Sequence, residues 1–297
     1  MSSLRAFVQA IQPHANRIVH ASMSSWNRID FNQHEPDILL EYLSGQGKGV
    51  DYLNEHLAAP LTRETDFVVK FCSILAHQKP RVHRTRHNQR ACVSPVPQSC
   101  ELGDLIIQFL LIDQDKKPMF MSALILQAKK GLSPDNLTQQ CLYEHDDRLI
   151  FPNYFGTPNE ECLLPGYEDQ RTHALAYLFL QDSFTGIGQI PNCAALRFPY
   201  SHLFLKILTT DFGKQFQYAE SNFNNDWDKL ISKVTLKLAE STYRGTNRVV
   251  GLDFFLEQFN DYYYHPEYLY RSEAEGLNII QIIVQPKKKL FDSGPLS

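Results

Sequence analysis

The chain has 297 residues, of which 43% are hydrophobic, enough to bury the core of one large domain or two smaller ones. The formal net charge is −4, so the overall charge gives no support to nucleic-acid binding, although a local basic groove would suffice for it. The six cysteines are not spaced as zinc ligands usually are, and the first residues contain no apolar run of the length expected for a secretory signal. No apolar run reaches the roughly 20 residues of a membrane helix. These features predict a cytoplasmic protein with free thiols and no membrane segment.

The N-terminal part of the chain has helical periodicity. Apolar residues recur at helical spacing from Leu4 to Ile11 and again before Gly45. A further helix is expected to begin at Thr62, a suitable N-cap residue, because the apolar residues that follow would share one helical face. Those residues are Phe67, Val68, Phe71, Ile74 and Leu75.

The clearest pattern in the chain is a pair of apolar runs. Residues 104–112 and 120–126 flank the polar stretch 113–118, and both runs are too apolar for edge strands with a solvated face. We therefore predict two central strands joined as a hairpin, preceded by an extended or irregular segment. The other expected elements are that segment at 80–100, a helix capped by Ser133, a strand at 174–180, helices at 225–242 and 251–263, and a strand at 277–284.

This order of elements predicts an α/β fold in which helices flank a mixed central β-sheet. We expect a helical N-terminal extension at residues 1–60 and a core at residues 61–185. A C-terminal α/β addition at residues 186–297 is expected to pack on that core.

The hairpin is predicted to bring polar side chains together at one end of its strands. If its turn is centred between Asp115 and Lys116, Asp104 lies directly opposite Gln127. Lys129 then lies two residues further along on the same face as Gln127, and a shift of one residue would separate them. A carboxylate, a carboxamide oxygen and an ammonium would converge there. The alternative is that these are only polar residues that mark strand ends.

The same residues carry a resemblance to a known family. Glu101-Leu-Gly-Asp104-Leu-Ile-Ile, followed by Leu124-Ile-Leu-Gln127-Ala-Lys129-Lys, resembles the PD-(D/E)XK nuclease superfamily, the fold of many restriction endonucleases. More narrowly, it is similar to bacterial anti-phage defence nucleases whose third motif is QxK. The family core of a helix, a three-strand meander, a helix and a further strand matches residues 61–181, and it implies a restriction-endonuclease-like core with additions on both sides.

The resemblance implies a metal-dependent nuclease site. Asp104 would be the main ligand of Mg²⁺ or Mn²⁺, Gln127 a neutral ligand through its side-chain oxygen, and the Ala128 carbonyl a third. Lys129 would position the attacking water or stabilise the charged transition state. The family's glutamate on the first helix matches Glu64, which would complete the metal site directly or through water.

Several further residues are expected to support this site. Asp66 is an alternative to Glu64, and Glu101 and Gln140 are expected close to the metal ligands, Gln140 within reach of the substrate. The alternatives are that Glu101 is a solvated loop carboxylate and that Gln140 lies on an exposed helix face. Phosphate contacts are expected from a basic stretch that could equally be a solvated loop, and from the lysine beside the site. These residues are Arg81, Arg84, Arg86, Arg90 and Lys130.

The sequence thus predicts a Mg²⁺-dependent deoxyribonuclease. By analogy with the resembling family, we expect this enzyme to be the effector nuclease of a bacterial anti-phage defence system. Such an enzyme must be restrained, so we expect a sensor, helicase or ATPase partner, or control through a homo-oligomer; the chain itself has no P-loop motif. Gln127 stands where Asp or Glu is usual, which leaves open an inactive nuclease-fold subunit that binds DNA or a partner protein. A third alternative, an interaction protein without a nucleic-acid role, predicts intramolecular ion pairs for Arg84 and Arg86.

Overall fold

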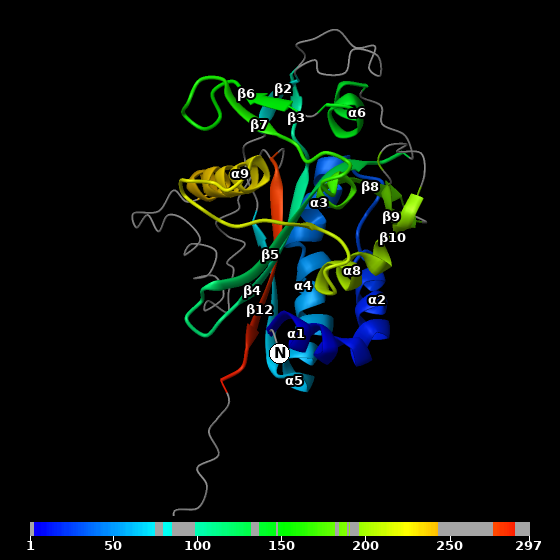
Figure 1. Ribbon diagram of the computed structural model, residues 1–297. Helices are drawn as coiled ribbons and strands as arrows, with labels where there is room; N and C mark the ends of the chain where they lie inside the picture. Colours follow the sequence, from blue (N-terminus) through cyan, green and yellow to red (C-terminus); the bar gives the residue numbers. More distant parts are fainter. Residues whose placement is uncertain are drawn as a thin grey trace, which may run out of the picture.

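A computed structural model describes residues 3–74, 80–84, 99–131, 137–146, 148–181, 184–188, 190, 196–242 and 276–288. This part of the chain forms an eight-stranded mixed sheet, a four-stranded antiparallel sheet, and helices on both faces of the larger sheet (Figure 1). The predicted α/β class with a mixed central sheet flanked by helices is confirmed. No helix within these residues is both long enough and apolar enough to cross a bilayer.

The N-terminal segment is helical, as predicted. Its buried side chains, among them Phe7 and Leu53, pack against one face of the large sheet. The helices are α1 (Ser3–Ile11), η1 (Gln12–His14), α2 (Ala15–Ser24), α3 (Glu35–Ser44), α4 (Gly49–Leu53), η2 (Asn54–Ala58) and α5 (Ala59–Glu64).

The large sheet has the strand order β1-β12-β4-β5-β8-β9-β10, with β11 paired to β5. Strands β4 and β5 form the predicted antiparallel hairpin in the predicted register, since Leu105 pairs with Leu126. All eight residues of β4 are buried, because neighbouring strands and covering layers enclose it on every side. The strands are β1 (Phe67–Ile74), β4 (Leu105–Ile112), β5 (Pro118–Lys129), β8 (Leu175–Gln181), β9 (Phe184–Gly188), β10 (Leu196–Pro199), β11 (Lys214–Gln215) and β12 (Asn278–Pro286).

The helix predicted from Thr62 onward is wrong. Helix α5 ends at Glu64, and the apolar residues beyond it form strand β1. This strand pairs antiparallel with β12 from the far end of the chain, from Phe67 opposite Pro286 to Ile74 opposite Ile279. An apolar run of this length fits either period, and the distant partner strand decides in favour of the sheet.

The outer edge of β1 is covered by side chains from the preceding helical segment. Asn54 Nδ2 donates to the Phe71 carbonyl at 2.7 Å, and the Phe71 amide donates to Asn54 Oδ1 at 2.9 Å. Thr62 Oγ1 accepts a hydrogen bond from the Val69 amide at 2.9 Å. These side chains take the place of a further strand, which protects the edge from pairing with another molecule.

Strand β12 lies between β1 and β4, antiparallel to β1 and parallel to β4. The large sheet therefore contains strands from both sides of the expected boundary between residues 185 and 186. Strand β8, helix α9 (Asp226–Thr242) and strand β12 match the elements predicted from the sequence. The predicted helix at 251–263 and the Ser133 cap lie outside the described residues.

The second face of the large sheet is covered by helix α9, helix α6 (Leu137–Glu144) and the small sheet. In Figure 1 the small sheet and α6 lie beyond one end of the long strands, and α5 lies at the opposite end. The remaining elements are β2 (Arg81–Arg84), β3 (Ser99–Glu101), β6 (Arg148–Phe151), β7 (Glu160–Leu163), α7 (Arg171–Ala174), η3 (Tyr200–His202) and α8 (Leu203–Leu208).

The cysteines depart in part from the expectation of free thiols. Cys72, Cys100 and Cys162 are free and buried. Cys141 in α6 is disulfide-bonded, so the expectation is wrong for this residue.

Candidate functional site

Asp104 lies at the start of β4, with its backbone held between two neighbouring strands. Its amide donates to the Leu126 carbonyl at 3.0 Å, and its carbonyl accepts from the Asn278 amide at 3.0 Å. These bonds extend the β4–β5 register by one residue and place Asp104 opposite Gln127. The predicted juxtaposition of the carboxylate and the carboxamide is confirmed.

Donors on β5 orient the Asp104 carboxylate. The Gln127 carboxamide donates through Nε2 to Asp104 Oδ2, and the Ala128 amide donates to the same oxygen at 2.8 Å. Both donors lie on β5, so the carboxylate is fixed against the end of that strand.

The oxygen of the Gln127 carboxamide, unlike its nitrogen, lacks a hydrogen-bond partner among the described residues. Gln127 is 1% exposed, and its Oε1 is buried without a hydrogen-bond partner among the described residues. An unsatisfied buried acceptor costs about 1–3 kcal/mol. A cation that the adjacent Asp104 carboxylate also binds would satisfy this oxygen.

Lys129 completes the predicted triad on the same face of β5. It is two residues beyond Gln127 and only 7% exposed. The β8 residues paired with these two positions are Tyr177 and Phe179, which belong to the core under α6, α9 and the small sheet. The triad therefore lies at the covered face of the sheet, close to its end.

Tyr143 of α6 is a neighbour of the site to which sequence analysis assigns no role. Its hydroxyl donates to the Leu102 carbonyl at 2.9 Å, and its ring stacks on Tyr177 with the centroids 5.4 Å apart. Burial, and secondarily the Asp104 carboxylate, raise the pKa of Tyr143 well above its usual value. Between Leu102 and Asp104, only glycine fits at Gly103, since a Cβ there would lie 2.9 Å from the Tyr143 hydroxyl.

Arg171 fixes the C-terminal end of α6 and was also missed. Its buried guanidinium donates to the Tyr143 carbonyl at 2.9 Å and to the Leu142 carbonyl at 2.8 Å. It also donates to the carbonyls of Pro165 and Asp146. A cation is favourable at a helix C-terminus, where carbonyl groups lack helical partners. No motif marks this residue in the sequence, because main-chain carbonyls that accept its hydrogen bonds leave no side-chain pattern.

Glu64 lies far from Asp104, so its predicted role as a metal ligand of the same site is wrong. Phe67, just after α5, pairs with Pro286 at one end of β12, whereas Leu105 pairs with Asn278 at the other end. At about 3.3 Å per residue, the two ends are on the order of 25 Å apart. Glu64 instead accepts a hydrogen bond from Arg17 at 2.6 Å, which lowers the pKa of its carboxyl.

Asp66, the alternative to Glu64, lies at the same distant end of the sheet. Its carbonyl accepts a hydrogen bond from the Lys287 amide, beyond the end of β12. The first-helix carboxylate of the family pattern therefore has no counterpart at the site from either residue, because the segment after α5 runs away from Asp104 as strand β1.

Arg84 is not placed to bind phosphate, which corrects a second prediction. It is 2% exposed and forms a buried ion pair with Asp146. Arg81 is exposed, and its Nε donates to Ser99 Oγ at 3.0 Å. Arg86 and Arg90 lie outside the described residues.

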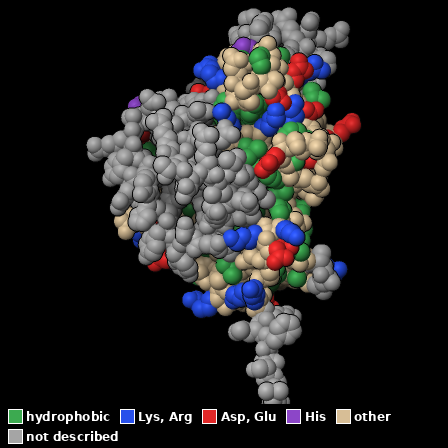
Figure 2. Space-filling view, turned by 90° about the vertical axis from the view of Figure 1, so that its left-hand side faces the viewer, with side chains coloured by type: hydrophobic (Ala, Val, Ile, Leu, Met, Phe, Trp, Pro, Cys, Tyr) green, Lys and Arg blue, Asp and Glu red, His purple; other side chains and the backbone are tan. Residues whose placement is uncertain are grey.

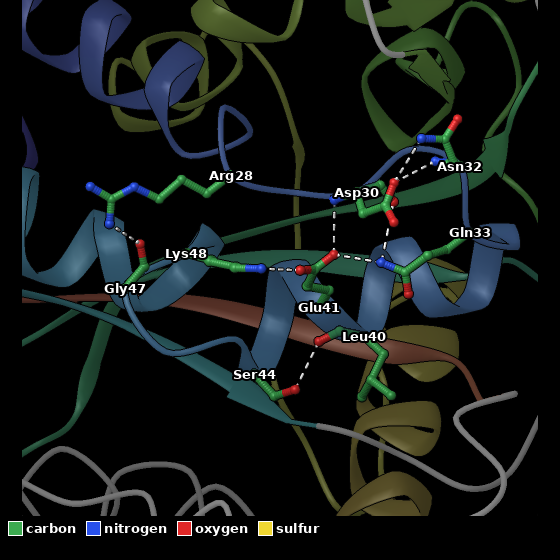
Figure 3. Close-up of polar contacts among 9 residues, drawn as sticks. All are labelled: Arg28, Asp30, Asn32, Gln33, Leu40, Glu41, Ser44, Gly47 and Lys48. Carbon is green, nitrogen blue, oxygen red and sulfur yellow. Dashed lines mark hydrogen bonds and ion pairs between the residues drawn. The ribbon is translucent and has the colours of Figure 1, made fainter.

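Lys130 contacts a loop of the N-terminal segment. It is exposed, and its Nζ donates to the Gln33 carbonyl at 2.7 Å. Glu41 holds this loop, accepting hydrogen bonds from the Asp30 amide at 3.0 Å and Gln33 Nε2 at 2.8 Å while pairing with Lys48 (Figure 3). The N-terminal segment thereby reaches the end of β5 that carries the site.

The two remaining predicted residues lie in the small sheet and in helix α6. Glu101 on β3 lies opposite Arg81 on β2 in the antiparallel register of these two strands. Gln140 of α6 donates to Glu144 Oε2 at 3.4 Å. Their predicted roles beside the metal ligands stay predictions.

The oxygen donors of the site suit a hard cation. In the described parts of the chain, no three His, Cys, Asp or Glu side chains form a group that could hold a metal ion. Asp104 and Gln127 supply one carboxylate and one buried amide oxygen, and Mg²⁺ is commonly bound through one or two carboxylates with water completing its shell. The donor set fits such an ion, with weak affinity expected from a single negative charge.

The surface charge on one side of the molecule is mixed. In Figure 2 the basic and acidic side chains of the described residues are interspersed, without one large field of a single sign.

Comparisons with models of protein families, with curated proteins and with solved structures find no match to this chain.

Proposed function

We propose that the chain is a Mg²⁺- or Mn²⁺-dependent deoxyribonuclease whose site is formed by Asp104, Gln127 and Lys129. The observation that carries this proposal is the buried Gln127 Oε1, which lacks a hydrogen-bond partner among the described residues beside the Asp104 carboxylate. The resemblance of these residues to the QxK branch of the PD-(D/E)XK nucleases gives the reaction class.

Each residue has a defined role in this proposal. Asp104 and Gln127 would hold the cation through their side-chain oxygens, with the Ala128 carbonyl as a further donor. The bound cation would supply charge stabilisation and a lowered pKa of coordinated water. Lys129 would hold the attacking water in place or stabilise negative charge on the phosphate through its ammonium group.

The biological setting is proposed from the resemblance alone. We infer a cytoplasmic effector nuclease of a bacterial anti-phage defence system, which a sensor, helicase or ATPase partner or an oligomeric assembly restrains. The contact of Lys130 with Gln33 gives one route by which the N-terminal segment would transmit such control.

A catalytically inactive subunit with a nuclease-like fold is the second candidate. It is favoured by the hydrogen bond from Gln127 Nε2 to Asp104, because this bond satisfies the carboxylate without a metal. The ion pair between Arg84 and Asp146 agrees in addition with an interaction protein that has no nucleic-acid role.

Cleavage of supercoiled and linear DNA in Mg²⁺, Mn²⁺ or EDTA distinguishes these candidates. The nuclease proposal predicts metal-dependent cleavage that Asp104→Ala and Lys129→Ala abolish. Asp115→Ala and Lys117→Ala are matched controls, since both side chains are exposed in the turn at the opposite end of the hairpin. Equal cleavage by all four variants would contradict the proposed site, and a silent wild type with unchanged DNA binding in every variant favours the inactive subunit.

A further inference from the structure

Two cationic side chains lie over a pair of buried phenylalanine rings beside β10. The guanidinium carbon of Arg197 is 4.7 Å from the centroid of the Phe212 ring, and Lys206 Nζ is 5.3 Å from that of Phe198. The two rings contact each other edge to face, with centroids 5.2 Å apart. The buried ring pair therefore seats both cations at one place in the fold.

Neither cation has a carboxylate partner within the described residues. Arg197 Nη1 donates to the Thr172 carbonyl, and in the same part of the chain the Lys206 ammonium forms no hydrogen bond or ion pair. By contrast Lys214, a cation that is also partly buried, pairs with Asp169 at 2.6 Å. Burial lowers the pKa of Arg197, as expected for a partly desolvated cation without an opposite charge.

A third basic group lies beside the same rings. The His173 ring is 6.0 Å from the Phe212 ring, and its pKa is lowered first by burial and then by the charge of Arg197, with a smaller contribution from Lys206. Asp211 opposes this effect, but its carboxylate is exposed and forms no ion pair with either cation in the described structure. Positive charge therefore predominates around the ring pair.

This cluster is separated from the candidate site by the large sheet. Phe198 and Phe212 belong to the core between the sheet and the N-terminal helices. Gln127 and Lys129 lie on the opposite face, because their register partners on β8 belong to the core under α6, α9 and the small sheet. A ligand held by the two cations is therefore distinct from a substrate at the candidate site.

The charge of the cluster favours a phosphate group over a carboxylate. A phosphate monoester carries about −1.5 to −2 charges at pH 7, and its oxygens accept hydrogen bonds from both a guanidinium and an ammonium. A carboxylate carries one negative charge and would match only one of the two cations. The planar donors of Arg197 suit phosphate oxygens in addition.

We propose that Arg197 and Lys206 form a binding site for a small phosphorylated ligand, whose phosphate monoester group supplies the negative charge that the two cations lack in the described chain. The site does not depend on the proposed nuclease function. It is a second ligand site, on the face of the sheet that the N-terminal helices cover.

Isothermal titration calorimetry of the full chain tests this site, with glycerol 3-phosphate as the probe and with EDTA present to exclude binding through a metal. Arg197→Gln with Lys206→Gln removes both charges, and Lys117→Gln with Lys287→Gln, at exposed positions, is the charge-matched control. We expect the first variant to bind the probe at least about tenfold more weakly, because removal of a charged hydrogen-bond partner has an effect of this order. The control is expected to bind as the wild type does.

Two further variants locate the site and guard against misfolding. Lys206→Gln alone leaves Arg197 on its ring and is expected to weaken binding about tenfold, so it tests the site even where the double variant is unstable. Asp104→Ala is expected to bind the probe with wild-type affinity, because Asp104 does not belong to the cluster.

No binding of glycerol 3-phosphate by the wild type at millimolar concentration, or equal affinities in the wild type and both Lys206 variants, would overturn the inference. Inorganic phosphate, acetate and a short DNA duplex identify the source of the anion. If acetate binds as well as the probe, or if only inorganic phosphate binds, the phosphate monoester assignment is wrong. If the duplex displaces the probe, and binds more weakly to the double variant than to its control, the cations serve a nucleic-acid backbone and the small-ligand assignment is wrong.

Discussion

The backbone around Asp104 is positioned from outside the hairpin. Tyr143 bonds the carbonyl of Leu102, and Gly103 allows the close approach of the Tyr143 hydroxyl. Arg171 fixes the helix end that carries Tyr143. The Asp104 carboxylate therefore depends on α6 as well as on β5.

Tyr143→Phe removes one hydroxyl and keeps the ring that stacks on Tyr177. We expect a loss of about 1 kcal/mol in the free energy of unfolding, from the Leu102 carbonyl left without its donor. We also expect weaker activation by Mg²⁺, because the Asp104 backbone is less well fixed, with unchanged DNA affinity. The measurements are urea unfolding and cleavage rate against Mg²⁺ concentration.

Tyr154→Phe is the control for this change, since the buried Tyr154 hydroxyl has no hydrogen-bond partner within the described residues. This control is expected to be neutral or stabilising. The same Mg²⁺ dependence in the wild type and in Tyr143→Phe would remove Tyr143 from the account of the site.

At the scale of elements, pairing between strands that are near in sequence could be predicted, and pairing between strands that are distant in sequence could not. The β4–β5 hairpin and its register were predictable, because two adjacent apolar runs and a short polar turn determine the pairing. Strand β1 was not predictable in this way, since its partner β12 lies at the other end of the chain. The error at Glu64 follows from that one, and the error at Arg84 arises because its partner Asp146 follows α6.

Asn54→Leu tests the protected edge of β1. Loss of the two hydrogen bonds to Phe71 leaves backbone groups of an edge strand unpaired, so we expect destabilisation by about 1–3 kcal/mol and concentration-dependent association. Urea unfolding and light scattering measure both effects. Asn27→Leu, at an exposed position, controls for added surface hydrophobicity, and equal behaviour of the two variants would refute the edge role of Asn54.

The N-terminal loop gives an element with a defined pH response. Burial raises the pKa of Glu41, but hydrogen bonds from Lys48, Asp30 and Gln33 together with the Lys48 charge hold it below the usual 4.5. A carboxyl whose pKa is lowered by folding stabilises the protein above the unfolded pKa, and this contribution disappears as the pH falls through the folded value.

Glu41→Gln should therefore be less stable than the wild type near neutral pH, and the difference should shrink below pH 4.5. Thermal unfolding across this range measures it, with Glu55→Gln as an exposed control. A difference that stays constant with pH would show that the Glu41 charge does not stabilise the loop.

At the scale of the whole molecule, chain segments that are far apart in sequence converge on one end of the large sheet. The hairpin supplies Asp104 and Gln127, β12 supports the Asp104 backbone, and the N-terminal loop contacts Lys130. The motif residues on the hairpin could be found from the sequence. Their supports could not, because main-chain acceptors and long-range contacts leave no local pattern.

The most direct test of this account is a titration of the protein with Mn²⁺, in which electron paramagnetic resonance measures the free ion. We predict one site in the wild type, its loss in Asp104→Ala, and tighter binding in Gln127→Glu, which adds a second carboxylate. Asp115→Ala is expected to bind as the wild type does. Equal Mn²⁺ binding by the wild type, Asp104→Ala and Gln127→Glu would contradict a metal site at Asp104 and Gln127.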